Sequence, residues 1–160
     1  MEKRIIETSV EIYSYEELEV SKKQLIDKAK EQVLKAYAPY SKFHVGAAVE
    51  LENGEIFAGS NQENSAYPSG LCAERVAMFF ANAQFPGVAV KTLAIAAYTN
   101  GKFLEEPITP CGSCRQVLLE TEQRFENDIT ILLYGSNHIF QLYNVKQLLP
   151  LCFEKSSLLK

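Results

Sequence analysis

The sequence predicts an α/β fold, a three-layer α/β/α arrangement with a mixed sheet of about five strands. Three observations lead to this prediction. Apolar segments typical of strands alternate with helical segments along the chain. The 160 residues are about one domain's worth, and 47% of them are hydrophobic, which is enough for a substantial core. Segment 91–98 (KTLAIAAY) is continuously apolar, as expected of a strand that helices cover on both faces.

The first clear element is a helix over 21–37. Ser21 and Gln24 have the spacing of a capping box, and Pro39 is expected to end the helix. Upstream, segment 7–15 is compatible with either a short strand or an ordered arm. The apolar residues of the helix recur at helical spacing: Ile26, Ala29, Val33, Leu34 and Tyr37.

A β-hairpin is expected over 43–61, followed by a buried helix. Two β-prone segments flank Asn53 and Gly54, and an Asn-Gly pair is the strongest short hairpin signal. Segment 72–83 (CAERVAMFFANA) is apolar on nearly every side, which predicts a helix buried all round.

The second half of the chain continues this alternation. A helix is expected to begin after Pro110, and Pro150 is expected to break a short terminal helix. No repeat or linker is evident, so 1–160 is predicted to be a single domain with 1–20 as an N-terminal extension. After the strand at 91–98 the expected elements are a helix, two strands and a short helix: 111–125, 128–135, 138–144 and 145–153.

Charge and hydropathy exclude several classes of partner. The formal charge is −4, from 16 basic and 20 acidic residues, and gives no basic surface for a phosphate backbone. The N-terminus lacks an apolar segment followed by a cleavage site, and apolar runs stay far below the roughly 18 residues that span a bilayer. We therefore expect a cytoplasmic protein with no nucleic-acid and no membrane partner.

The four cysteines indicate a metal site. Grouped cysteines in an intracellular chain more often hold metal or perform chemistry than form disulfides. Cys72 begins one predicted helix, and Cys111 and Cys114 share a face of the first turn of another. A helix N-terminus favours thiolate over thiol. If the two helix ends meet, they present three thiolates to one zinc ion.

The fourth zinc position is predicted to be open. Cys152 lies in the apolar segment LLPLCF, where a free cysteine usually behaves as a small buried hydrophobe. His44 and His138 lie in or beside predicted strands without the paired spacing of ligands. Structural zinc sites are closed by four protein ligands, whereas catalytic sites keep one position for water. The pattern therefore favours catalytic zinc.

Glu74 and two arginines complete this prediction. A carboxylate two residues from a thiolate ligand costs several kcal/mol to bury without a partner, but beside an activated water it can transfer protons. Arg75 and Arg115 could donate to the sulfurs and offset the negative charge of three thiolates around zinc. Two alternatives stay open: a redox Cys111/Cys114 pair, and a non-catalytic zinc module closed by Cys152.

The segments CAE (72–74) and PCGSCRQ (110–116) resemble the zinc-dependent cytidine deaminase family, whose pattern is a metal ligand, any residue, Glu, and later P-C-x-x-C. The resemblance covers about residues 37–153 and is closest to the small homotetrameric branch. Its departures include His44, Gln62 and a longer stretch at 84–109. Five blocks carry it in the family's order: 37–49, 59–67, 72–77, 110–117 and 148–153.

The resemblance implies one zinc ion per subunit and hydrolytic deamination of cytidine and 2′-deoxycytidine to the uridines and ammonia, in pyrimidine salvage. A blasticidin-type aminopyrimidine nucleoside is the alternative substrate. Glu74 would move protons between the attacking water, N3 and the leaving amino group. The other implied roles are zinc ligation, base stacking, ribose binding, a backbone contact to the base and contributions from a neighbouring subunit: Cys72, Cys111 and Cys114; Phe43; Asn61 and Glu63; Ala73; Tyr67 and Phe153.

Overall fold

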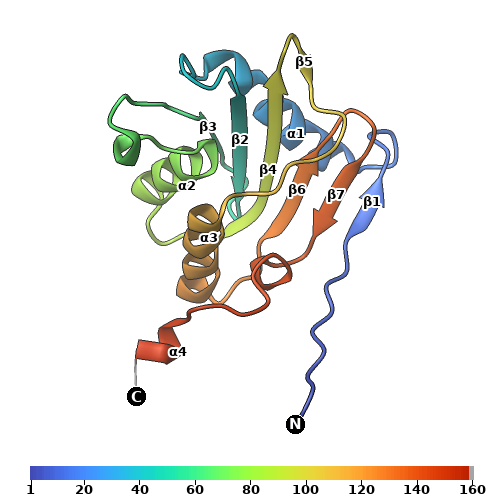
Figure 1. Ribbon diagram of the computed structural model, residues 1–160, viewed down its shortest axis with the longest axis vertical. Helices are drawn as coiled ribbons and strands as arrows, with labels where there is room; N and C mark the ends of the chain where they lie inside the picture. Colours follow the sequence, from blue (N-terminus) through green and yellow to red (C-terminus); the bar gives the residue numbers. More distant parts are fainter. Residues whose placement is uncertain (159–160) are drawn as a thin grey trace.

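A seven-stranded mixed sheet forms the centre of the computed structural model, which describes residues 1–158 (Figure 1). The strand order is β1-β7-β6-β4-β2-β3, with β5 pairing β4. β4 and β6 pair in parallel, whereas the other described pairs are antiparallel. The strands are β1 (Glu11–Tyr13), β2 (His44–Leu51), β3 (Ile56–Ser60), β4 (Val90–Thr99), β5 (Lys102–Phe103), β6 (Thr130–Tyr134) and β7 (Ile139–Leu142).

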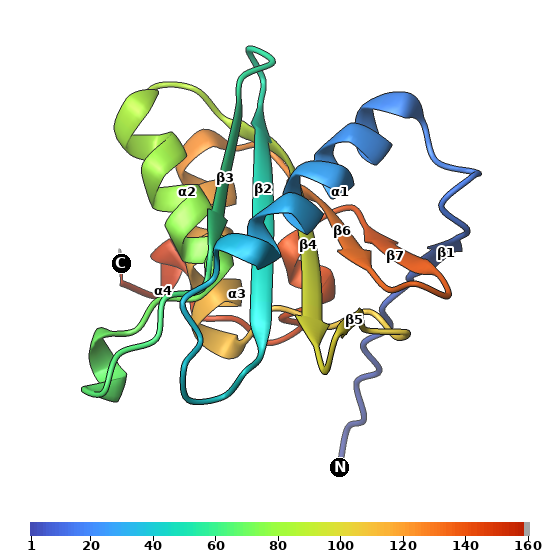
Figure 2. The ribbon, with the colours of Figure 1, turned by 90° about the horizontal axis from the view of Figure 1, so that it is seen from above.

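Helices cover both faces of this sheet, which confirms the predicted three-layer fold (Figure 2). α1 lies on one face and α2 and α3 lie on the other. None of the described helices combines the length and the apolar character that crossing a bilayer requires. The helices and 3-10 turns are α1 (Val20–Gln32), η1 (Val33–Lys35), η2 (Tyr67–Ser69), α2 (Ala73–Gln84), α3 (Gly112–Phe125), η3 (Val145–Gln147) and α4 (Lys155–Leu158).

The five expected strands are all present as β2, β3, β4, β6 and β7, and two short strands are additional. β1 lies in segment 7–15, for which strand and arm were both open, so part of the expected N-terminal extension belongs to the sheet. β5 has only two residues, too few for a periodic pattern to reveal it. The predicted hairpin is confirmed, with Gly54 in its turn at a φ of +86°, which glycine adopts without strain.

Three details of the predicted helices are wrong. α1 begins at Val20 after Glu19, whose side chain makes no capping hydrogen bond, so Ser21 lies inside the helix and forms no capping box. The α-helix also ends at Gln32, well before Pro39. In place of the terminal helix over 145–153 there is a single 3-10 turn, η3.

α2 is not buried all round, contrary to the prediction. Ala77, Met78 and Ala81 face the core, but Phe79 and Phe80 are 46% and 52% exposed. An apolar composition does not distinguish a helix face packed in its own core from a face available to another molecule.

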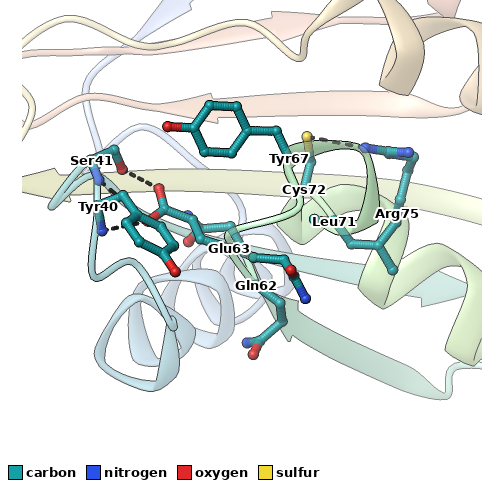
Figure 3. A pocket seen from close by; sticks show the side chains of 11 residues that line it. Tyr40, Ser41, Gln62, Glu63, Tyr67, Leu71, Cys72 and Arg75 are labelled. Carbon is teal, nitrogen blue, oxygen red and sulfur yellow. Dashed lines mark hydrogen bonds between the residues drawn. The ribbon is translucent and has the colours of Figure 1, made fainter.

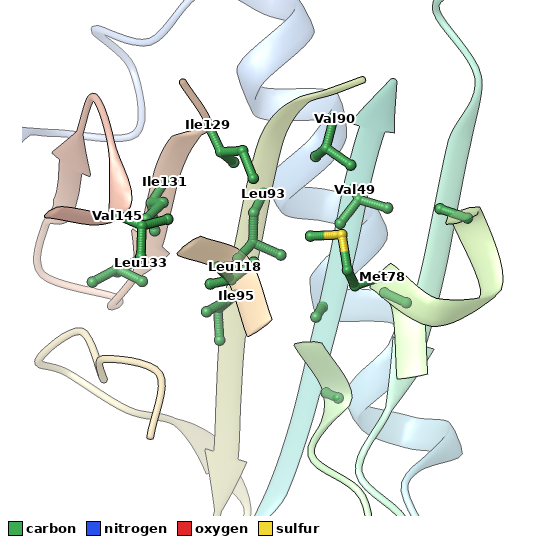
Figure 4. Packing of buried hydrophobic residues seen from close by; sticks show 14 of the residues in the cluster. Val49, Met78, Val90, Leu93, Ile95, Leu118, Ile129, Ile131, Leu133 and Val145 are labelled. Atoms are coloured by element: carbon green, nitrogen blue, oxygen red, sulfur yellow. The ribbon is translucent and has the colours of Figure 1, made fainter. Parts of the chain in front are cut away.

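Two apolar clusters pack against opposite faces of the sheet. Along β4, Leu93 and Ile95 point toward α2 and α3, whereas Ala94 and Ala96 pack on the α1 side (Figure 4). This alternation explains why 91–98 is continuously apolar. On the α1 side the small residues allow close approach: a Cβ atom on Gly46 would lie 2.0 Å from the Ala29 carbonyl oxygen.

Candidate metal centre and active site

The N-termini of α2 and α3 meet at a cluster of three sulfur atoms. Cys72 and Cys111 are the N-cap residues of α2 and α3, and neither side chain makes a capping hydrogen bond. The Sγ atom of Cys111 lies 3.8 Å from that of Cys72 and 3.6 Å from that of Cys114. All three sulfurs lie within 4.8 Å of one another. The predicted convergence of the thiols is therefore confirmed.

These sulfurs fit a tetrahedral zinc ion. A Zn–S distance of about 2.3 Å in a tetrahedral site places sulfurs about 3.8 Å apart, close to the separations observed. Within residues 1–158, the group of candidate metal ligands contains these three cysteines alone. Cys152 instead donates its thiol to Oε1 of Glu154 at 3.2 Å. The donor set is thus that of a zinc site with room for a non-protein ligand.

Hydrogen bonds among the sulfurs and a nearby cation shift the pKa values of the thiols. The pKa of Cys72 is lowered, mainly by a hydrogen bond from Cys114 and also by Arg75. Arg75 donates from Nη2 to Sγ of Cys72 over 3.6 Å (Figure 3). The pKa of Cys114 is raised, first by its hydrogen bond with Cys72 and then by burial. The guanidinium of Arg75 therefore favours the thiolate form of Cys72.

Arg115 does not make the hydrogen bond to a sulfur that was predicted for it. Its Nε donates to the Pro110 carbonyl at 2.8 Å, one Nη donates to the Leu148 carbonyl at 2.6 Å, and the other donates to Oγ1 of Thr109 at 2.8 Å. All three nitrogens are thus engaged with oxygen atoms. The physical reason is position: its side chain points along the segment before Cys111 rather than toward the cluster.

Glu74 is a buried carboxyl beside this cluster. It is the second residue of α2 and is only 5% exposed. Burial raises its pKa, and the neighbouring Cys72 thiolate raises it further. A carboxyl that is buried and close to sulfur has the properties of a group that exchanges protons.

A cavity of about 610 Å³ opens beside Cys72 (Figure 3). Cys72 and Arg75 lie at one end of it and Glu63 lies toward the other. This volume falls within the range of small-molecule sites. The cavity is lined by Tyr40, Ser41, Asn61, Gln62, Glu63, Asn64, Tyr67, Gly70, Leu71, Cys72 and Arg75.

Glu63 faces the cavity and also orders the loop opposite. Its carboxylate accepts hydrogen bonds from the backbone N–H of Tyr40 at 2.9 Å, from that of Ser41 at 3.3 Å and from the Ser41 hydroxyl. These hydrogen bonds lower the pKa of Glu63, and the bond from the Ser41 hydroxyl has the largest effect. The carboxylate is therefore ionised at neutral pH and ready to accept further hydroxyl donors.

Asn61 joins the end of β3 to the start of β2. Its Oδ1 accepts from the Val45 N–H at 2.8 Å and its Nδ2 donates to the Phe43 carbonyl at 2.9 Å. Each of these amide atoms can make one more hydrogen bond. No local pattern predicts that Asn61 and Glu63 hold this segment, because their partners, backbone groups and the Ser41 hydroxyl, lie about 20 residues away.

The other expected site residues are distributed as follows. Tyr67 lines the cavity and is 79% exposed, and Ala73 is buried at the start of α2. Phe43 is half-buried and outside the cavity lining. Phe153 is 58% exposed in the irregular segment after η3. Tyr40 and Ser41 also line the cavity, but the sequence did not identify them as site residues, although both lie in segment 37–49, which carries part of the family resemblance.

Known proteins are similar to this chain in sequence and in fold. The family profile of the cytidine and deoxycytidylate deaminase zinc-binding region matches residues 19–125. A cytidine deaminase of Sporosarcina psychrophila is 41% identical over 136 residues, 84% of this chain and 93% of its own. One of Halalkalibacterium halodurans is 37% identical over 118 residues, 74% of this chain and 83% of its own.

Solved structures agree with the sequence matches. The crystal structure of cytidine deaminase from Burkholderia pseudomallei has a TM-score of 0.68 and 37% identity, covering 81% of this chain and 97% of that one. That of Mycobacterium tuberculosis has a TM-score of 0.65 and 32% identity, covering 85% and 99%. Together with the three-cysteine cluster, these matches show that the chain belongs to the zinc-dependent cytidine and deoxycytidylate deaminase family.

Proposed function

We propose that the chain hydrolyses the 4-amino group of cytidine and 2′-deoxycytidine, releasing ammonia and leaving uridine and 2′-deoxyuridine. The observation that carries this proposal is a buried carboxyl, Glu74, beside three converging sulfurs, one of which belongs to Cys72 in the wall of a nucleoside-sized cavity. Similarity to cytidine deaminases over most of the chain supports the same reaction.

Cys72, Cys111 and Cys114 would hold the zinc ion. When bound, zinc supplies a nucleophile at neutral pH by lowering the pKa of a water molecule. Glu74 would take one proton from the water that adds to C4 and deliver it to N3 of the pyrimidine. It would then move the remaining proton, from the new C4 hydroxyl, to the amino group, which leaves as ammonia when the C4–N bond breaks. Its burial suits this work, because a raised pKa brings a carboxyl closer to the pH at which it must both accept and donate.

Asn61 and Glu63 are proposed to bind the ribose, chiefly its 3′-hydroxyl. The proposal is supported by the place of Glu63 in the cavity wall and by its carboxylate, which already accepts the hydroxyl of Ser41. A site that pairs a sugar hydroxyl discriminates strongly against analogues that lack it. From the family resemblance, Phe43 is proposed to stack on the base and Ala73 to offer it a backbone contact.

Arg75 is proposed to offset the charge of the thiolates, since it already donates to Cys72. A cationic donor withdraws electron density from sulfur and keeps zinc an effective acid.

The working protein is proposed to be a homotetramer with shared active sites. Support comes from aromatic side chains that are unusually exposed: Tyr67 at the cavity, Phe153 after η3, and Phe79 and Phe80 on α2. Exposed apolar groups near a site often mark an interface. Tyr67 and Phe153 are the residues proposed to complete a neighbour's site.

We also propose that the enzyme works in the cytoplasm, in pyrimidine salvage, and that the chain is one domain with an N-terminal extension.

Ammonia release tests the proposed reaction. Purified protein is incubated with cytidine, 2′-deoxycytidine, cytosine, a blasticidin-type nucleoside and single-stranded DNA, with and without a strong zinc chelator. We expect ammonia from the first two, loss of activity on zinc removal, and recovery when zinc is returned. Ammonia from the blasticidin-type nucleoside alone, or activity indifferent to zinc removal, would contradict the proposal.

A further inference from the structure

Arg115 joins two segments that are far apart in the sequence. Its guanidinium donates to Thr109 and Pro110, just before the zinc ligand Cys111, and to the carbonyl of Leu148 in the C-terminal part of the chain. The three donor–acceptor distances lie between 2.6 and 2.8 Å. The planar guanidinium has five N–H groups in a fixed fork, which lets one side chain hold several acceptors in a set geometry.

The segment before Cys111 depends on this contact. Residues 104 and 105 are held by the turn after β6, through the N–H groups of Ser136 and Asn137. In the described part of the chain, residues 106–110 make no backbone–backbone hydrogen bond. Apart from the burial of Pro110 and the packing of Ile108 against the core, it is the side chain of Arg115 that holds the two residues leading directly into the ligand.

The second segment held by Arg115 leads to Phe153. Residues 148–154 form no helix or strand. Leu148 is held by Arg115, and the adjacent Gln116 donates from Nε2 to the Phe153 carbonyl at 2.9 Å. One turn of α3 thus positions the approach to Cys111 and the stretch that carries a proposed substrate-site residue.

We infer that Arg115 is a positioning residue, which fixes Cys111 and segment 148–153 relative to each other, and that it acts through geometry rather than through its charge. The inference rests on the proposed zinc-dependent function. Its acceptors are two neutral carbonyls and a hydroxyl, and no carboxylate of the described residues forms an ion pair with it. A single positive charge at this place therefore cannot replace the fork.

Zinc release tests this inference. Arg115→Gln and Arg115→Lys are loaded with zinc, mixed with a chromogenic chelator and followed without substrate; KM and kcat for cytidine are measured in parallel. We expect release on the order of 10-fold faster in both variants, as is typical when groups that orient ligands are removed, together with a raised KM. The lysine variant keeps the charge but not the three contacts, so it should not restore the wild-type rate.

Arg124→Gln is the matched control. Arg124 lies on the same helix and also donates to a backbone carbonyl, that of Pro86 at 2.6 Å, away from the sulfur cluster. Its zinc release should stay within about twofold of wild type even if its thermal stability falls as much as that of Arg115→Gln. The inference would be overturned if both Arg115 variants released zinc at the wild-type rate, or if Arg115→Lys alone restored that rate.

Thr109→Val keeps the inference testable if the arginine variants do not fold. It removes one of the three acceptors and should accelerate zinc release about threefold; an unchanged rate would count against the positioning role. The two proposals fail differently. If the wild-type protein binds no zinc or deaminates no nucleoside, the proposed function is contradicted. If the wild type is active and holds zinc, but the Arg115 variants release zinc at the wild-type rate, only this inference is contradicted.

Discussion

Replacing Asn61 with alanine removes the two hydrogen bonds that join the end of β3 to the start of β2. Oδ1 loses the Val45 N–H at 2.8 Å and Nδ2 loses the Phe43 carbonyl at 2.9 Å. With about 1 kcal/mol net for each bond, the free energy of unfolding should fall by about 2 kcal/mol. For a chain of this size that lowers Tm by roughly 4–8 °C.

Denaturant unfolding and steady-state kinetics measure the two consequences. Asn137→Ala is the control, since Asn137 lies exposed in the turn after β6 and should change the unfolding free energy by less than about 0.5 kcal/mol. Because each amide atom of Asn61 can also bond to ribose, KM should rise more for cytidine than for 3′-deoxycytidine. Unchanged stability in Asn61→Ala would refute the structural role, and equal KM changes would refute the sugar contact.

Three further predictions concern a carboxylate, a buried acid and a glycine. Glu63→Ala should raise KM for cytidine strongly while zinc content, measured by metal analysis, stays at wild-type level. Glu122 accepts the N–H groups of Ile129 and Val145, each at 2.9 Å, so Glu122→Ala should lose about 2 kcal/mol in denaturant unfolding. Burial raises the Glu122 pKa, so wild type should lose stability relative to Glu122→Gln as pH rises through that pKa; a pH-independent difference would contradict this. Gly46→Ala should cost about 3 kcal/mol through its clash with α1, whereas Gly87→Ala, with nothing within 4 Å, should not; equal effects would contradict the packing.

The sequence predicted the strands of the sheet and the paired cysteines of α3 because both depend on local pattern. The apolar run at 91–98 is long enough to predict a strand that helices cover on both faces, and the Asn53-Gly54 pair predicts the turn of a β-hairpin. The spacing of Cys111 and Cys114 places both in one helical turn, and the structure adds what spacing alone left conditional, the meeting of this turn with Cys72 at the start of another helix.

Features that depend on distant partners were not predictable in this way. The capping box at Ser21 fails because α1 begins one residue earlier, and the terminal helix fails because residues 148–153 follow contacts with α3. The hydrogen bonds of Arg115 were unpredictable for the same reason, because its acceptor Leu148 is 33 residues away and no sequence spacing connects the two. The exposure of Phe80 likewise depends on what else packs on α2.

Zinc content and ammonia release measured together on Glu74→Gln address the central claim, that a buried acid beside an under-coordinated metal transfers the protons of the reaction. The substitution keeps the size of the side chain but removes its ability to ionise. We predict one zinc per chain and cytidine turnover lowered by at least about 100-fold, with exposed Glu120→Gln unchanged in both. Wild-type turnover by zinc-loaded Glu74→Gln would contradict the account.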